Sequence, residues 1–448
     1  MHDKPPPPAV KHPSSAAALG AILGVSIGLS LGVSALLAGA VQSVSARAQL
    51  DQTFLNATQH PAIQYENAAT DDVVARLNGE LASGAVRLTG GEPLARLRSI
   101  LRALDVPLES QVAVFSRTGI QAALTSRRNP RVLFFNDSVV VGWVRGGFVE
   151  VAVQSPRQGA VFYSLEQDSA GVPTFRRRTE CLRCHHSYST SGVPGMIVRS
   201  VFPGSDGFPM RQLGDYFTDD RSPFEERWGG WYVTGTHGSM RHMGNATVAD
   251  PERAASMVST ATLNLPSLEG KVDAGATLTP HSDIVALLVL EHQIHMNNLF
   301  TRIGWEVRLA AHETPPATVP ISDLAREVVD YMLFVDEVPL TSPVRGSSGF
   351  AQAFAGSGPR DASGRSLRQL DLERRLLRYP CSFTIYGDVF DALPADAKAA
   401  IYARMWEVLS GQERDARHAR VSSADKQAII DILRATKKDL PAYFVAAR

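Results

Sequence analysis

The sequence is poor in cysteine and carries no excess charge of either sign. Its 448 residues include only three cysteines, Cys181, Cys184 and Cys381, which are too few for the disulfide framework of small secreted proteins. Lys plus Arg and Asp plus Glu both number 45, so no net field attracts nucleic acid, and we expect no nucleic-acid partner. Apolar residues make up 44% of the chain and charged residues 20%, as in globular proteins.

Two of the three cysteines stand in the most informative segment. Residues 181–185 read Cys-Leu-Arg-Cys-His, which is the attachment signature of a c-type haem. Two thiols about one helical turn apart each reach a vinyl group of the porphyrin, and the following histidine supplies an axial nitrogen to the iron. The segment therefore predicts one covalent haem c, bound through Cys181 and Cys184, with His185 as the proximal iron ligand.

Two other interpretations of this segment stay open. A zinc site also uses a C-x-x-C pair with histidines such as His185 and His186, but it needs further ligands, and the remaining cysteine, Cys381, is single. A redox dithiol favours a βαβ context and needs no histidine. Cys381 is most simply a buried free thiol.

The N-terminal region predicts export. Residues 16–41 contain no charged residue and exceed the roughly 20 residues that cross a bilayer as a helix. Lys4 and Lys11 precede this run, which places the N-terminus in the cytoplasm and the bulk of the chain outside. We expect a disordered cytoplasmic tail over residues 1–15 and a transmembrane anchor or signal peptide over residues 16–48. The predicted location is the bacterial inner membrane with a periplasmic domain, or the periplasm if the segment is cleaved.

Small residues recur within the apolar run at every fourth position. They are Gly20, Gly24, Gly28 and Gly32. Small residues at this spacing let two membrane helices approach closely. The pattern predicts a homodimer formed through the anchor.

The remaining chain divides into three regions, and the expected fold class is α+β. It combines an N-terminal membrane helix, a small antiparallel β region, a loop-rich mono-haem segment and a mainly α-helical C-terminal part. The α/β region covers 49–175, with helices over 71–81 and 93–104 and strands over 111–115, 131–135, 139–144, 149–153 and 160–165. The haem c attachment region covers 176–280. The helical region covers 281–448, with helices over 282–303, 321–334, 370–377, 395–409 and 423–436.

The sixth ligand decides what the haem can do, because a second axial side chain favours electron transfer and an open site binds small molecules. Residues 235–244 supply His242 and Met243 between flexible glycines. His292 lies on the apolar face of the helix expected over 282–303 and is the third distal candidate. Met196 and Met210 lie closer to the motif in sequence, which leaves little chain to pass around the porphyrin edge.

Arginines suit planar carboxylates, so Arg199 and Arg241 are the expected partners of the haem propionates. The run Arg176-Arg177-Arg178 either docks an acidic redox partner or forms a solvated face. An alternative interpretation makes His237 and Arg241 catalytic, as proton acceptor and charge stabiliser near a bound peroxide.

Segments beyond the motif carry a broader resemblance. They are residues 134–137 (Phe-Phe-Asn-Asp), 192–195 (Gly-Val-Pro-Gly), 231–238 (Trp-Tyr-Val-Thr-Gly-Thr-His-Gly) and 379–382 (Tyr-Pro-Cys-Ser). With the C-x-x-C-H motif, they resemble a group of uncharacterised exported bacterial proteins classed as cytochrome c domain-containing. The resemblance covers most of the chain after residue 110 and implies functional roles for Cys181, Cys184 and His185 alone.

These observations favour a membrane-anchored periplasmic mono-haem c-type cytochrome that transfers electrons to a redox partner protein. The alternatives are a peroxidase-like haem enzyme, a haem-based sensor with an open distal site, and a zinc-stabilised binding protein.

Overall fold

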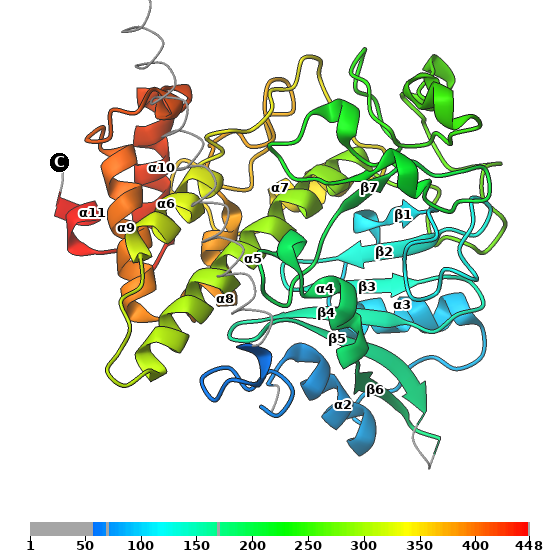
Figure 1. The fold of residues 1–448 in the computed structure, drawn as a ribbon, viewed down its shortest axis with the longest axis horizontal. Helices are drawn as coiled ribbons and strands as arrows, with labels where there is room; N and C mark the ends of the chain where they lie inside the picture. The colour runs from blue at the N-terminus through cyan, green and yellow to red at the C-terminus, as the bar shows by residue number, and fades with distance from the viewer. Residues whose placement is uncertain (1–56, 69–70, 168–170, 447–448) are drawn as a thin grey trace, which may run out of the picture. The chain divides into compact units, whose positions relative to one another are not determined.

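An antiparallel sheet of seven strands organises the computed structural model, which describes residues 57–68, 71–167 and 171–446. The strand order is β6-β5-β4-β3-β2-β1-β9, and Figure 1 shows strands β1 to β5 lying one beside the next. Their bounds are β1 Val112–Val114, β2 Arg131–Phe135, β3 Val139–Trp143, β4 Glu150–Ser155, β5 Gly159–Gln167, β6 Pro173–Arg177 and β9 Trp231–Tyr232. A separate pair joins β7 (Arg199–Val201) to β8 (Asp215–Phe217).

Both faces of this sheet are apolar, so the central strands are buried almost throughout. Alternate residues of a strand point to opposite faces, and the two core clusters follow this rule. Val132 and Phe134 pack in one cluster with α2 (Val73–Ser83) and α3 (Pro93–Ala103). Leu133 and Phe135 pack in the other cluster with α5 (Ile284–His312).

Helix α5 is the central helix, and 23 of its 29 residues are buried. It begins at Asp283, a fully buried N-cap whose carboxylate accepts from the amides of Val285 and Ala286. In Figure 1 it runs between the sheet and the C-terminal helices. The other helices of this layer are α6 Ile321–Met332, α7 Phe350–Gly356, α8 Asp388–Asp391, α9 Ala395–Leu409, α10 Ser423–Thr436 and α11 Ala442–Ala446.

The structure contradicts the expected fold class. The β region is the central seven-stranded sheet and is not small, and it extends beyond the expected region boundaries. Strand β9 comes from the segment expected to be loop around a cofactor, yet it pairs with β1 at the sheet edge. The short strands β6 and β9 were not predicted because they lack the Val- and Phe-rich alternation of the others. Ten α-helices occur among the described residues.

A second correction concerns residues 370–377, which are not helical. The backbone turns back on itself there, since the amide of Asp371 donates to the carbonyl of Leu376 and that of Leu372 to Arg375. Leu372 has a positive φ of 59°, which an α-helix does not contain. The spacing of leucines in this segment reflects burial of Leu376 and Leu377 in a turn.

The expected tail over 1–15 and the expected anchor over 16–48, with Gly20, Gly24, Gly28 and Gly32, lie outside the described residues. Within the described ranges, none of the helices combines the length and apolar character needed to cross a bilayer. The membrane helix of the expected fold class is therefore not part of the fold described here.

Candidate haem-attachment site

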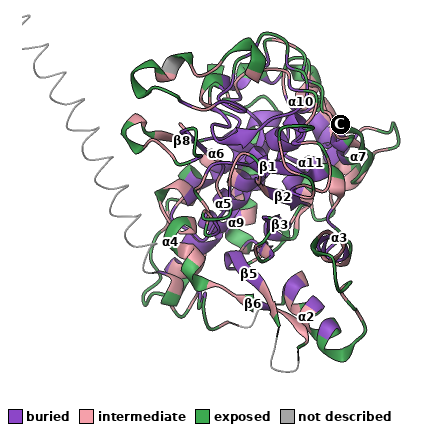
Figure 2. Cartoon of the chain, turned by 90° about the vertical axis from the view of Figure 1, so that its right-hand side faces the viewer, coloured by how far each residue is buried: buried purple, intermediate pink, exposed green. Residues whose placement is uncertain are grey.

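The C-x-x-C-H motif follows directly from an edge strand of the sheet. After β6, the amide of Arg178 donates to the carbonyl of Phe162 in β5 at 2.8 Å. The chain then turns through Thr179–Cys181 into the single-turn helix α4 (Leu182–His185). Figure 2 shows α4 in the colours of intermediate and exposed residues. Cys181 is partly buried and Cys184 exposed, and neither forms a disulfide, so both thiols are free to bind a porphyrin.

A cavity of about 510 Å³ opens beside this motif. Its size lies within the roughly 300–1,000 Å³ of small-molecule and cofactor sites. Cys181, Cys184 and His185 line it together with one face of the sheet and two residues of α5. Apolar residues form most of its wall, namely Leu133, Val140, Ala152, Phe162, Met196, Val198, Trp231, Leu290 and Ile294. The motif therefore borders a largely apolar space of cofactor size.

His185 is held in one orientation by its own chain. Its Nδ1 lies 3.0 Å from the carbonyl oxygen of Gly195, so Nδ1 carries the proton and donates, and Nε2 is left with its lone pair. The ring also packs against Phe162, with 4.7 Å between ring centroids. Burial lowers the pKa of His185 to about 4, which keeps the imidazole neutral at physiological pH. A neutral imidazole whose other nitrogen is hydrogen-bonded is the form in which histidine ligates metals.

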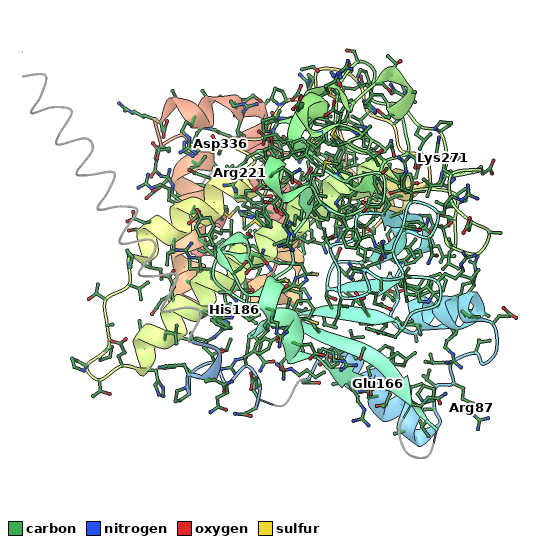
Figure 3. The ribbon with its side chains drawn as sticks, turned by 45° about the vertical axis from the view of Figure 1, so that its right-hand side comes forward. Arg87, Glu166, His186, Arg221, Lys271 and Asp336 are labelled. Atoms are coloured by element: carbon green, nitrogen blue, oxygen red, sulfur yellow. The ribbon has the colours of Figure 1, made fainter. Side chains whose placement is uncertain are left out.

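The Gly-Val-Pro-Gly segment at 192–195 supports both histidines of the motif region. The carbonyl of Gly192 lies 3.0 Å from Nε2 of His186, and the amide of Gly195 donates to the carbonyl of His185 at 2.8 Å. The carbonyl of Pro194 accepts from the amide of Ala160 in β5 at 2.8 Å. This segment thus ties the motif back to the sheet. In Figure 3, His186 lies near the ribbon of the motif, and Glu166 lies further out on the β5–β6 pair.

Charged side chains also line the cavity. Arg131 forms an ion pair with Glu150, and Nε2 of Gln121 donates to the same carboxylate at 2.7 Å. Arg178 pairs with Glu166 at 2.7 Å, and Arg183 also lines the cavity. Arg131 in β2 and Glu150 in β4 come from one face of the sheet, whereas Arg178 and Arg183 come from the segment that carries the motif. The cavity is therefore amphipathic, because both apolar and charged side chains line it.

Arg131, Glu150 and Arg183 were missed as site residues by the sequence analysis. The guanidinium of Arg131 lies over Gly142, where an added Cβ would be 3.1 Å from it. A glycine in the middle of a strand often marks the close approach of another group. Gly142 was therefore the one feature of the sequence that indicated a close contact in this strand, although it did not indicate which side chain makes it.

The expected propionate partners lie elsewhere. Arg199 pairs with Asp215 across the β7–β8 pair, and Arg241 donates to the carbonyl of Val258 at 2.7 Å. Neither lines the cavity beside the motif. Arg178 does line it, whereas Arg176 pairs with Glu166 at 3.0 Å.

The histidines of the 235–244 segment bind each other. Nε2 of His237 lies 3.1 Å from Nε2 of His242 and accepts from the amide of Asn264 at 3.0 Å. His242 also packs edge-on against Trp228. Burial lowers the pKa of His242 to about 3 and that of His237 below its ordinary value, so both rings stay neutral. The structure does not bring this pair to the cavity, and Arg241 is absent from its lining as well.

The other two distal candidates are engaged in the core. The thioether sulfur of Met243 accepts from the hydroxyl of Ser200 at 3.6 Å. His292 stacks on Phe334 with 4.1 Å between centroids. Its Nδ1 lies 3.3 Å from Asp220, and its Nε2 lies 2.7 Å from Ser382. Met243 and His292 are thus both satisfied away from the cavity.

Ser382, His292 and Asp220 are connected in the order of a hydrolase triad. Ser382 and His292 are fully buried, and neither lines any of the described cavities. Ser382 also accepts from the amide of Thr384 as the N-cap of a short 3-10 helix at Phe383–Tyr386. Because Ser382 and His292 are buried, a substrate has no access to them. We therefore interpret these hydrogen bonds as structural contacts that join α5 to the 379–386 segment.

The residues around the cavity fit a covalently bound haem. Two thiols and an imidazole held by a hydrogen bond line the cavity, its apolar side chains suit a porphyrin ring, and its arginines suit the two carboxylates of the porphyrin. Among the described residues, no cluster of three or more His, Cys, Asp or Glu side chains suits a metal ion held by protein ligands alone. The zinc alternative therefore gains no support from the described part of the chain.

Comparison of the chain with protein families, curated proteins and solved structures found no match. The motif and the cavity beside it are therefore the features of the chain that bear on its function.

Proposed function

We propose that this protein is an exported mono-haem c-type cytochrome that transfers electrons. The observation that carries the proposal is the position of the C-x-x-C-H motif on an amphipathic cavity of about 510 Å³, with Nδ1 of His185 already bound to Gly195. Cys181 and Cys184 would hold the haem by thioether bonds, and His185 would ligate the iron through Nε2. When bound, the haem supplies a one-electron Fe(III)/Fe(II) couple.

The chain's own residues explain how such a group would be oriented. The haem propionates would bind the guanidinium groups of Arg131, Arg178 and Arg183, because arginine forms bidentate hydrogen bonds with planar carboxylates. The apolar wall would exclude water from the ring, and this exclusion is one determinant of a haem's potential. Because covalent haem attachment of this kind takes place outside the cytoplasm, we place the folded part of the protein in the periplasm.

The exposed edge of the cavity is the proposed exit for electrons. Cys184 is exposed, and Ile120 and Phe148, which line the cavity, are 62% and 38% exposed. A partner that packs on these apolar side chains would approach the haem edge directly. The neighbouring arginines would favour a partner with an acidic surface.

The first test is the mass and the absorption spectrum of protein produced with haem-attachment machinery. We expect a mass increase of one haem that survives acid extraction, and its loss in the double variant Cys181→Ser/Cys184→Ser. Cys381→Ala is the matched control and should retain the haem, since Cys381 is buried in the core. A wild-type chain without covalent haem would overturn the proposal.

The second test separates the two adjacent histidines. His185→Ala should lose the proximal ligand and change the spectrum. His186→Ala should keep it, because Nε2 of His186 is used by the carbonyl of Gly192. Equal spectra for the wild type and His185→Ala would refute the ligand assignment.

A haem-based sensor or enzyme is the second candidate function. It is favoured by the finding that His242, Met243 and His292 all have partners away from the cavity. The proton acceptor and charge stabiliser suggested for a peroxidase, His237 and Arg241, do not line the cavity either.

A further inference from the structure

The side chains that line the cavity limit which of them can reach the sixth position of the iron. Besides Cys181, Cys184 and His185, the described lining offers four side chains of types that can bind iron. These are Met196, Tyr163, Glu150 and Glu180.

Tyr163, Glu150 and Glu180 already have partners within the protein. The hydroxyl of Tyr163 donates to the carboxylate of Asp72 at 2.6 Å, and Asp72 is the N-cap of α2 on the opposite face of the sheet. Glu150 is paired with Arg131 and accepts from Gln121. Glu180 is ion-paired with Arg178 at 3.1 Å, so each of the three has a partner within the protein.

Met196 follows Gly195, which lies on the Nδ1 side of the His185 ring. The sixth position would lie on the Nε2 side, beyond the porphyrin. The carbonyl of Gly195 is bound to Nδ1 of His185, whereas Nε2, on the other side of the ring, is the nitrogen that would ligate the iron. Met196 is the next residue, so its Cα lies about 3.8 Å from that of Gly195. Its backbone is held there, since Nδ2 of Asn298 donates to the carbonyl of Met196 at 2.9 Å. A side chain of three rotatable bonds that starts there does not pass around a porphyrin edge to the opposite face.

We infer that no described side chain closes the sixth position, which is left for a small uncharged molecule from solution, such as a diatomic gas. This inference rests on the proposed covalent haem and specifies what that haem binds. It favours the second candidate function, a haem-based sensor or enzyme, over electron transfer. The ligand class follows from the wall, because Val140, Phe162, Leu290 and Ile294 offer no partner to a charged ligand. Burying an unpaired charge against such a wall is costly.

The test is carbon monoxide binding by the reduced, haem-loaded full-length protein, followed by absorption spectroscopy. We expect a high-spin spectrum before addition and a stoichiometric shift on carbon monoxide addition at micromolar concentration. A low-spin six-coordinate haem that does not bind the gas would overturn the inference and leave the covalent haem of the proposed function intact. A chain without haem would overturn both.

Single substitutions sharpen the test. Met196→Leu conserves volume, so it should fold and leave the spin state unchanged. We also expect an unchanged spin state in the single variants His242→Gln, Met243→Leu and His292→Gln. A change from low spin to high spin in any one of them would identify a protein ligand and refute the inference. Resonance Raman spectra of the ferrous forms provide an independent readout of iron coordination.

Discussion

Nδ1 of His185 lies 3.0 Å from the carbonyl oxygen of Gly195. The amide of Gly195 donates in return to the carbonyl of His185, so the two residues, ten positions apart, are joined twice. The preceding carbonyl, that of Pro194, is bound to Ala160 in β5. The orientation of the imidazole is therefore set by the sheet before any ligand arrives, which reduces the cost of ordering the site on binding.

This relationship predicts that Gly195→Ala destabilises the protein. A Cβ at Gly195 would lie 2.2 Å from Oδ1 of Asn298, so either the segment or Asn298 must move. We expect a loss of about 1–3 kcal/mol in the free energy of unfolding, as for other overpacked sites, measured by urea denaturation. Gly79→Ala is the control, because nothing lies within 4 Å of its Cβ, and in helix α2 it should stabilise by about 0.5–1 kcal/mol. Equal effects of the two substitutions would contradict the packing described.

The pair Arg131–Glu150 predicts non-additive substitutions. Their side chains are 26% and 17% exposed, so removing one partner leaves a poorly hydrated charge behind. We expect Arg131→Ala to destabilise the protein more than Arg131→Ala/Glu150→Ala does, with a coupling energy of about 0.5–3 kcal/mol. A double-mutant cycle by chemical denaturation measures it. Additive effects would show that the two side chains act independently.

Asp283 should be among the most sensitive polar positions. Its carboxylate accepts from two amides at the start of α5 and from the amides of Ser347 and Ser348, both at 2.7 Å. Asp283→Ala removes the cap and leaves these donors buried, so we expect a loss of at least about 2 kcal/mol, measured by urea denaturation. Ser422→Ala, which removes the exposed cap of α10, should cost less. The reverse order would contradict the assigned role of Asp283.

The raised pKa of Glu337 predicts that the free energy of unfolding falls as the pH rises. Burial raises the pKa of Glu337 to about 8, and Asp220 contributes in the same direction. Between about pH 5 and 8 the unfolded chain has released this proton and the folded chain keeps it, so the unfolded state binds fewer protons and stability decreases with pH. Each unit of pKa difference corresponds to about 1.4 kcal/mol.

Glu337→Gln should flatten this pH dependence and raise the stability near pH 8, as measured by denaturation at several pH values. Glutamine keeps an oxygen for the amide of Leu376, which now donates to Glu337 at 2.7 Å. Glu413→Gln is the control: hydrogen bonds from the amide of Asp415 and from Arg404 lower the pKa of Glu413 to about 2. Glu413 is therefore ionised in both states above pH 5, and its replacement should leave the slope unchanged. An unchanged slope in Glu337→Gln would refute the assignment.

Local patterns in the sequence predicted most regular elements. The expected strands at 131–135 and 139–144 match β2 and β3, and the expected helix at 395–409 matches α9. These elements can be predicted from the sequence because alternation and helical periodicity are properties of neighbouring residues. The two-residue strand β9 could not be predicted from the sequence, since its pairing with β1 joins segments more than 100 positions apart.

The sequence by itself determined the C-x-x-C-H spacing, the chemistry of its three functional side chains and the periodicity of the core elements. Tertiary structure alone decided which side chains share the cavity. It placed Arg131 and Glu150 beside the motif and removed Arg199, Arg241, His242, Met243 and His292 from it. The physical reason is that a site assembled across a sheet depends on strand register and on which polar groups satisfy one another, and neither is encoded in any short segment.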